Sequence, residues 1–140
     1  MKVKKVFIAL AAAGLLMTAC QTQSHREAQA MLDSARMACD NQRYQEALNT
    51  IERLRSQYPD EIEVRKEALK LFQDASLKMA QADIAVTDSA LQATTAQMQA
   101  EQRIYERNML GVKKDSLQAR YEALIGVVRM IRKRMDETQK

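Results

Sequence analysis

Few side chains in this 140-residue chain can carry out covalent or metal chemistry. The candidates are two thiols, Cys20 and Cys39, and one imidazole, His25. A structural zinc site needs four such ligands, so no metal site is expected. The serines of the second half have no histidine beside them to act as a base, and no glycine-rich phosphate loop is present. The sequence therefore predicts neither an enzyme nor a cofactor.

Cys20 stands out because of the segment before it. Lys2, Lys4 and Lys5 form a positive start, residues 6–17 are almost purely apolar, and the small residues Thr18 and Ala19 precede the cysteine. This order is typical of a secretory signal. A membrane-spanning helix needs about 20 apolar residues, and no later stretch has that length, so no transmembrane helix is expected.

The run Leu16-Met17-Thr18-Ala19-Cys20 resembles the signal of bacterial lipoproteins, although Met17 stands where that family most often has leucine. An ordinary secretory signal that happens to end near a cysteine is the alternative. The resemblance implies a signal peptide over 1–19, cleavage between Ala19 and Cys20, and acyl chains such as palmitate on Cys20. Two or more chains would anchor the protein stably in a membrane.

The resemblance also implies a location. No aspartate directly follows Cys20, and in enterobacterial lipoproteins an aspartate there marks retention in the inner membrane. We therefore expect an outer-membrane lipoprotein of the cell envelope that faces the periplasm, with residues 20–24 as the lipidated cysteine and a short tether.

The net charge argues against nucleic acid as a partner. The whole chain carries +4, but residues 1–19 contain three lysines and no acidic residue. Their removal leaves a net charge of about +1, so the mature chain lacks the persistent basic face that nucleic-acid binding needs.

Composition predicts an all-α fold. The chain has no Trp, one Pro and three Gly, and it is rich in Ala, Gln, Leu, Met, Arg and Glu. These residues favour helices, whereas loops need more turn formers than this chain contains.

The first helical pair is expected over residues 24–59. Apolar residues recur three and four apart from Ala28 to Cys39, residues 40–43 form a turn, and a second apolar face runs from Tyr44 to Tyr58 before Pro59. The spacing of Tyr44, Ala47, Leu48, Ile51, Leu54, Tyr58 and Pro59 resembles the second helix of a tetratricopeptide (TPR) repeat. TPR lipoproteins of the β-barrel assembly machinery have similar helices. An ordinary antiparallel helix pair is the alternative.

A long helix is expected over residues 60–110, capped by Asp60 and free of Pro and Gly. A seam recurs every seven residues, as in a coiled coil, with small residues between its members. The members of this seam are Leu77, Ile84, Leu91, Met98, Tyr105 and Val112.

Residues 108–114 are expected to form a turn at Gly111, followed by a C-terminal amphipathic helix over 115–138. Its apolar residues are Leu117, Tyr121, Leu124, Val128, Ile131 and Met135. The predicted architecture is a TPR-like helical hairpin packed on a long helix that folds back as an antiparallel coiled-coil hairpin, with Leu117 opposite Tyr105 and Met135 near Thr87 or Leu91. The alternative is one uninterrupted helix from Asp60 to the C-terminus, which would require oligomerisation.

The function expected from these features is a membrane-anchored, non-enzymatic scaffold or adaptor for an envelope protein. The contact surface is expected within residues 80–100, which contain few charges. The predicted contact residues are Met79, Ile84, Leu91 and Met98. The alternatives are a self-assembling coiled-coil spacer, in which the chain is a homo-oligomer, and a periplasmic holdase chaperone.

Overall fold

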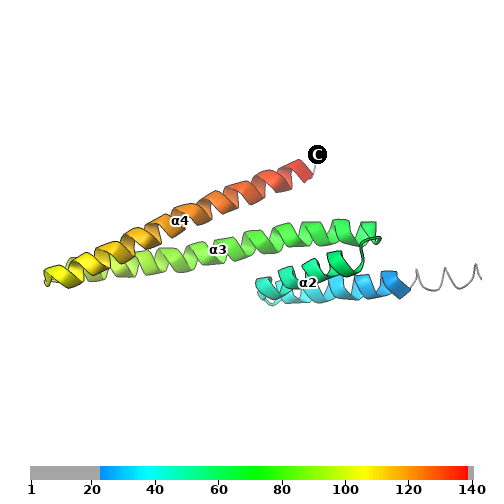
Figure 1. Cartoon of the computed structure of the whole chain (residues 1–140), viewed down its shortest axis with the longest axis horizontal. Coiled ribbons are helices and arrows are strands. Elements are labelled where there is room, and N and C mark those ends of the chain that lie inside the picture. Colours follow the sequence, from blue (N-terminus) through cyan, green and yellow to red (C-terminus); the bar gives the residue numbers. More distant parts are fainter. Residues whose placement is uncertain (1–22, 139–140) are drawn as a thin grey trace, which may run out of the picture. The chain divides into compact units, whose positions relative to one another are not determined.

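The computed structural model describes residues 23–138, which form four helices and, within that range, no strand (Figure 1). The helices cover residues 23–40, α2 (Tyr44–Gln57), α3 (Ile62–Ala100) and α4 (Ile104–Thr138). The predicted all-α class is confirmed. The chain divides into two units after Phe72, so α3 contributes its first turns to one unit and the remainder to the other.

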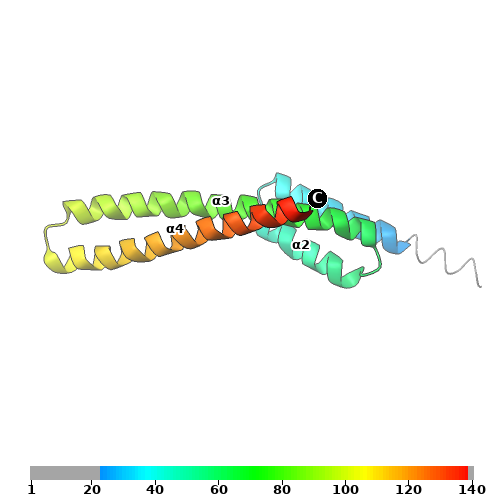
Figure 2. The ribbon, with the colours of Figure 1, turned by 90° about the horizontal axis from the view of Figure 1, so that it is seen from above.

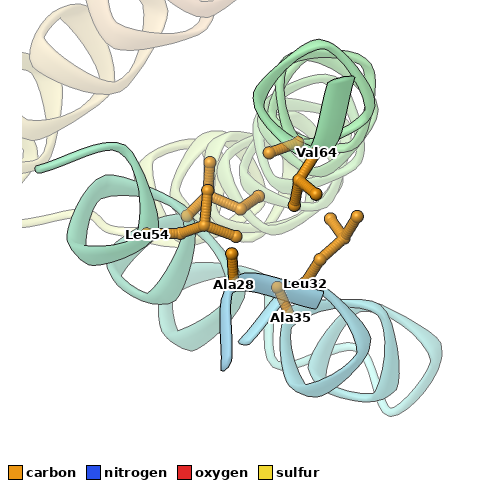
Figure 3. Packing of buried hydrophobic residues seen from close by; sticks show 7 residues of the cluster. Ala28, Leu32, Ala35, Leu54 and Val64 are labelled. Atoms are coloured by element: carbon orange, nitrogen blue, oxygen red, sulfur yellow. The ribbon is translucent and has the colours of Figure 1, made fainter. Parts of the chain in front are cut away.

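The first unit is a helical hairpin packed on the start of α3. Residues 23–40 and α2 supply most of its core, and Val64 and Ala68 of α3 complete it (Figure 3). Leu32, Ile51 and Leu54 are the largest fully buried side chains of the described residues. On helix 23–40 the buried residues Ala28, Leu32 and Ala35 are four and three apart, and on α2 Ile51 and Leu54 are three apart, so each set lies on one face, as the sequence predicts.

The turn between the first two helices follows the predicted 40–43 boundary. The backbone N–H of Arg43 donates to the Ala38 carbonyl at 2.8 Å, and that of Gln42 donates to the Cys39 carbonyl at 2.9 Å. This pair of hydrogen bonds is the Schellman ending of a helix. Gln42 has φ 60°, the left-handed conformation that the motif requires.

The start of α3 is one residue later than predicted. The Glu61 carbonyl accepts the first helical hydrogen bond, from the Arg65 N–H at 2.9 Å, so Glu61 rather than Asp60 is the N-cap residue. Asp60 belongs to the preceding turn, where its carbonyl accepts from the Ile62 N–H at 3.0 Å.

The second unit is the predicted antiparallel hairpin, here formed by α3 and α4 (Figures 1 and 2). The uninterrupted helix is thereby excluded, but the position of the turn was predicted wrongly. α3 ends at Ala100 instead of residue 110, and α4 begins at Ile104 instead of residue 115. Gly111, where the turn was expected, and residue 115, where the last helix was expected to begin, both lie inside α4.

Local interactions stabilise the turn at residues 101–103 without glycine or proline. The Glu101 carboxylate accepts hydrogen bonds from the Arg103 backbone N–H at 2.9 Å and from its Nε at 3.2 Å. Hydrogen bonds from Arg103 lower the pKa of Glu101 below its ordinary value. Arg103 also pairs with Glu106 in the first turn of α4 at 3.1 Å.

Two side-chain relationships define the register of the hairpin. Gln73 Nε2 donates to Thr138 Oγ1 at 3.0 Å, and a β-carbon added to Gly111 would lie 3.9 Å from Met98 Sδ. Interpolation between these pairs puts Leu117 level with Gln92, so the predicted pairing of Leu117 with Tyr105 is wrong. Met135 is level with Ser76, closer to the start of α3 than predicted.

The position of the turn can be tested with Gly111→Ala. Glycine inside a helix costs about 1 kcal/mol relative to alanine, and the added methyl would make an ordinary contact with Met98. We expect the free energy of unfolding to rise by about 1 kcal/mol in urea denaturation. A loss of stability would instead indicate that Gly111 needs a left-handed conformation, as in the turn expected from the sequence.

Candidate interaction surfaces

The predicted lipidation site, Cys20, and the predicted cleavage residue, Ala19, lie outside the described residues. None of the helices within residues 23–138 contains an apolar stretch of the length that a membrane span requires. In the same range, no group of three or more His, Cys, Asp and Glu side chains is arranged to hold a metal ion.

The predicted contact residues on α3 are half-buried. Ile84, Leu91 and Met98 share the face of α3 on which Thr87 and Thr94 are buried, and this face packs against α4. Met79 is also half-buried. The structure thus brings three of these residues together in the seam of the hairpin, where α4 covers part of their surface.

The seam itself has a thin core. The predicted apolar face of α4 is confirmed, because Val128 is buried and the other members are half-buried: Leu117, Tyr121, Leu124, Ile131 and Met135. The buried residues of α3 in this unit are small: Ala75, Ala80, Thr87 and Thr94. Small residues allow close approach of two helices but bury little apolar area, so the seam gives modest stability.

Tyr105 and Val112 were predicted to extend the seam, and this prediction is wrong. Their exposed fractions are 72% and 67%. The turn at residues 101–103 interrupts the seven-residue repeat and rotates both side chains away from α3.

The exposed face of α4 carries an uncharged stripe that the sequence analysis missed. We call it the outer stripe: Tyr105, Met109, Val112, Ser116, Ala119, Ala123, Gly126 and Met130. Its members are spaced alternately four and three residues apart, which places them on one side of the helix. The spacing is present in the sequence, but the turn predicted at residues 108–114 divides the pattern.

Gly126 is the least expected member of the outer stripe. A β-carbon added at this position would meet no atom within 4 Å, so the packing of the chain itself does not require glycine. Glycine inside a helix is unfavourable, which makes its presence informative. On an exposed helix face it permits another backbone to approach closely.

A second surface feature lies between the end of α2 and the first turns of α3. It is a groove of about 220 Å³ lined by Arg55, Ile62, Arg65, Lys66 and Leu69, which we call the basic groove. The four residues from α3 are three, one and three apart and share a face, but their convergence with Arg55 depends on tertiary packing. The sequence spacing alone therefore does not predict this site.

The basic groove lies near the N-terminal end of the first helix. His25 Nδ1 is 2.8 Å from Glu61 Oε2, and the Tyr58 hydroxyl donates to Glu27 Oε2 at 3.0 Å. Both contacts join the first turns of helix 23–40 to the connection between α2 and α3. His25 therefore has a structural partner, Glu61. Neither of the two contacts includes a serine.

No family model, curated protein or solved structure matches this chain.

The Tyr58–Glu27 contact makes a testable contribution to alkaline stability. The hydrogen bond to Glu27 is the main reason that the pKa of Tyr58 is raised, with burial and the negative charge of Glu27 as further causes. Because the folded-state pKa exceeds the unfolded one, the stabilisation is present below about pH 10 and is lost as the pH rises through the folded value. We expect Tyr58→Phe to remove this part of the pH dependence of the unfolding free energy. The same change of unfolding free energy with pH above about pH 10 in wild type and variant would contradict the assignment.

Proposed function

We propose that this chain is a membrane-anchored, non-enzymatic lipoprotein of the bacterial envelope that acts as a helical scaffold or adaptor for another protein. The lipoprotein-like signal ending at Cys20 supports the anchor. The outer membrane, with the described residues in the periplasm, is the proposed location, because no aspartate follows Cys20. The TPR-like spacing of the hairpin supports a role in protein contact.

The outer stripe is the observation that carries the scaffold role. It extends over 26 residues of α4, or about 38 Å of helix at 1.5 Å per residue. With a width near that of a helix face, its area is on the order of 400 Å². Exposed apolar patches of about this size are often functional, and the outer stripe consists mainly of apolar and small residues. The partner that fits is another helix, since alternating spacings of four and three are those of a coiled-coil seam.

We propose this surface ahead of the one expected from the sequence. Ile84, Leu91 and Met98 are half-buried and face α4, so they contribute to the hairpin before they can contribute to a partner. The outer stripe requires no opening of the hairpin. The N-terminal end of the outer stripe supplies bulky contacts from Tyr105, Met109 and Val112. The small residues that follow allow close approach of a second helix.

Self-association is the alternative, and one observation favours it. Asp115 and Arg120 flank the outer stripe on opposite sides, five residues apart. In a parallel pairing of two α4 helices, each Asp115 would face the Arg120 of the other copy. A homomeric spacer would use the same stripe as an adaptor, so the two roles differ in the identity of the second helix.

The anchor can be tested by mass spectrometry of the protein extracted from bacterial membranes. We expect an N-terminal Cys20 that carries a thioether-linked diacylglycerol and no residues 1–19. A Cys20→Ser variant should lack the lipid mass and retain the signal peptide. A native protein with an unmodified Cys20 thiol would overturn the anchoring proposal.

The outer stripe can be tested by comparing Val112→Glu with Val86→Glu. Both valines are exposed on helices, by 67% and 69%, but only Val112 belongs to the stripe. We expect Val112→Glu to weaken partner capture, or self-association in analytical ultracentrifugation, by at least about tenfold, which corresponds to one buried interface residue. Val86→Glu should leave both unchanged. Equal effects of the two variants would contradict the assignment of the stripe as the interface.

A further inference from the structure

We propose that the basic groove binds the phosphate of an anionic phospholipid headgroup and thereby docks the first unit on the membrane surface. The proposal deepens the function above, because it gives the anchored protein a second, non-covalent contact with the bilayer. Its physiological setting rests on the proposed anchor at Cys20, but headgroup binding is measurable without it.

The position of the groove is the first argument. The His25–Glu61 and Tyr58–Glu27 contacts place the connection between α2 and α3 beside the start of helix 23–40. Cys20 precedes residue 23 by three residues, and three residues span at most about 11 Å. An acyl chain on Cys20 would therefore keep this end of the first unit within reach of the lipid headgroups.

The charge of the groove is the second argument. Arg55, Arg65 and Lys66 contribute three cations, and Arg55 and Arg65 form no ion pair with any described residue. Lys66 pairs with Glu63 at 2.8 Å, but both side chains are largely exposed, so the pair is weak and can open. Phosphate oxygens are strong acceptors for guanidinium and ammonium donors.

Arg65 supports the same conclusion. One of its terminal nitrogens donates to the Pro59 carbonyl at 2.5 Å, which holds the guanidinium against the connection between α2 and α3. Its Nε is buried without a hydrogen-bond partner among the described residues. An unsatisfied buried donor is unfavourable, and the negative charge of an anion bound to the accessible guanidinium nitrogens of Arg65 would offset part of this cost.

The apolar lining distinguishes a lipid from a simple anion. Ile62 is 61% exposed at the first turn of α3, and Leu69 lies two turns further along the same face. Apolar side chains beside cations suit the boundary between headgroups and acyl chains. The partial positive charge at the N-terminus of α3 adds to the attraction for phosphate.

The experiment uses the purified full-length protein in a neutral detergent, with Ile62→Cys labelled by an environment-sensitive fluorophore. Dihexanoylphosphatidylglycerol is the anionic probe and dihexanoylphosphatidylcholine is its zwitterionic counterpart. We expect a saturable response to the anionic lipid that the zwitterionic lipid does not produce. A label at Asn41→Cys, in the turn between the first two helices, should respond to neither.

Charge reversal provides the matched comparison. Arg55→Glu should weaken the anionic response by roughly fivefold or more, the effect of one cation near an anionic surface. Arg53→Glu, on the same helix but outside the groove, should have no comparable effect. Equal responses to the two lipids, or equal effects of the two substitutions, would overturn the proposal. A response to a peptide with a free C-terminal carboxylate, without one to phosphatidylglycerol, would also overturn it and indicate a peptide site.

Inorganic phosphate and vesicle flotation complete the test. Millimolar phosphate that competes with the anionic lipid, but does not by itself produce the response of the label at Ile62→Cys, would support headgroup recognition. If phosphate alone reproduced the full response, the groove would be a general anion site and the lipid assignment would be overturned. Flotation with phosphatidylcholine vesicles reports the acyl anchor alone. A protein that binds phosphatidylglycerol but does not float would refute the anchor and leave the groove assignment supported.

Discussion

The residue at which α3 ends determines which side of α4 meets solvent. An antiparallel hairpin with its turn at residues 101–103 places Leu117 to Met135 against α3 and leaves Tyr105, Met109 and Val112 exposed. A turn ten residues later would have buried a different set. The Glu101–Arg103 interaction stabilises this turn, and both the seam and the outer stripe depend on where the turn lies.

The two units differ in how their stability is distributed. Leu32, Ile51 and Leu54 are fully buried in the first unit, whereas the second has only small residues and Val128 in its buried set. The first unit therefore has the larger apolar core. The second presents a thin seam on one side of each helix and a large exposed surface on the other, which suits a segment that gains apolar contacts when a partner is bound.

Much of the first unit was predictable because its signals are local. Pro59 ends α2, and the apolar spacing from Ala28 to Cys39 gives the first helix and its buried face. The turn of the second unit was not predictable from such signals. Residues 101–103 contain no glycine or proline, and Gly111 suggested a break at a position that lies inside α4.

The candidate surfaces also differ in how far the sequence predicts them. The seven-residue repeat identified the right face of α3 at Ile84, Leu91 and Met98, but the repeat alone does not reveal that the covering helix is α4 of the same chain. The sequence does not predict the basic groove, for a different reason. Arg55 joins Arg65 and Lys66 only after α2 and α3 pack, and sequence spacing carries no information on that convergence.

The outer stripe contains Met109 and Met130, each 54% exposed. A thioether is readily oxidised to a sulfoxide, which turns a flexible apolar side chain into a polar one. At these two positions the change would place a strong dipole on a surface that otherwise lacks charge. Helix pairing along this face would therefore be sensitive to oxidants, and methionine sulfoxide reductases could restore it.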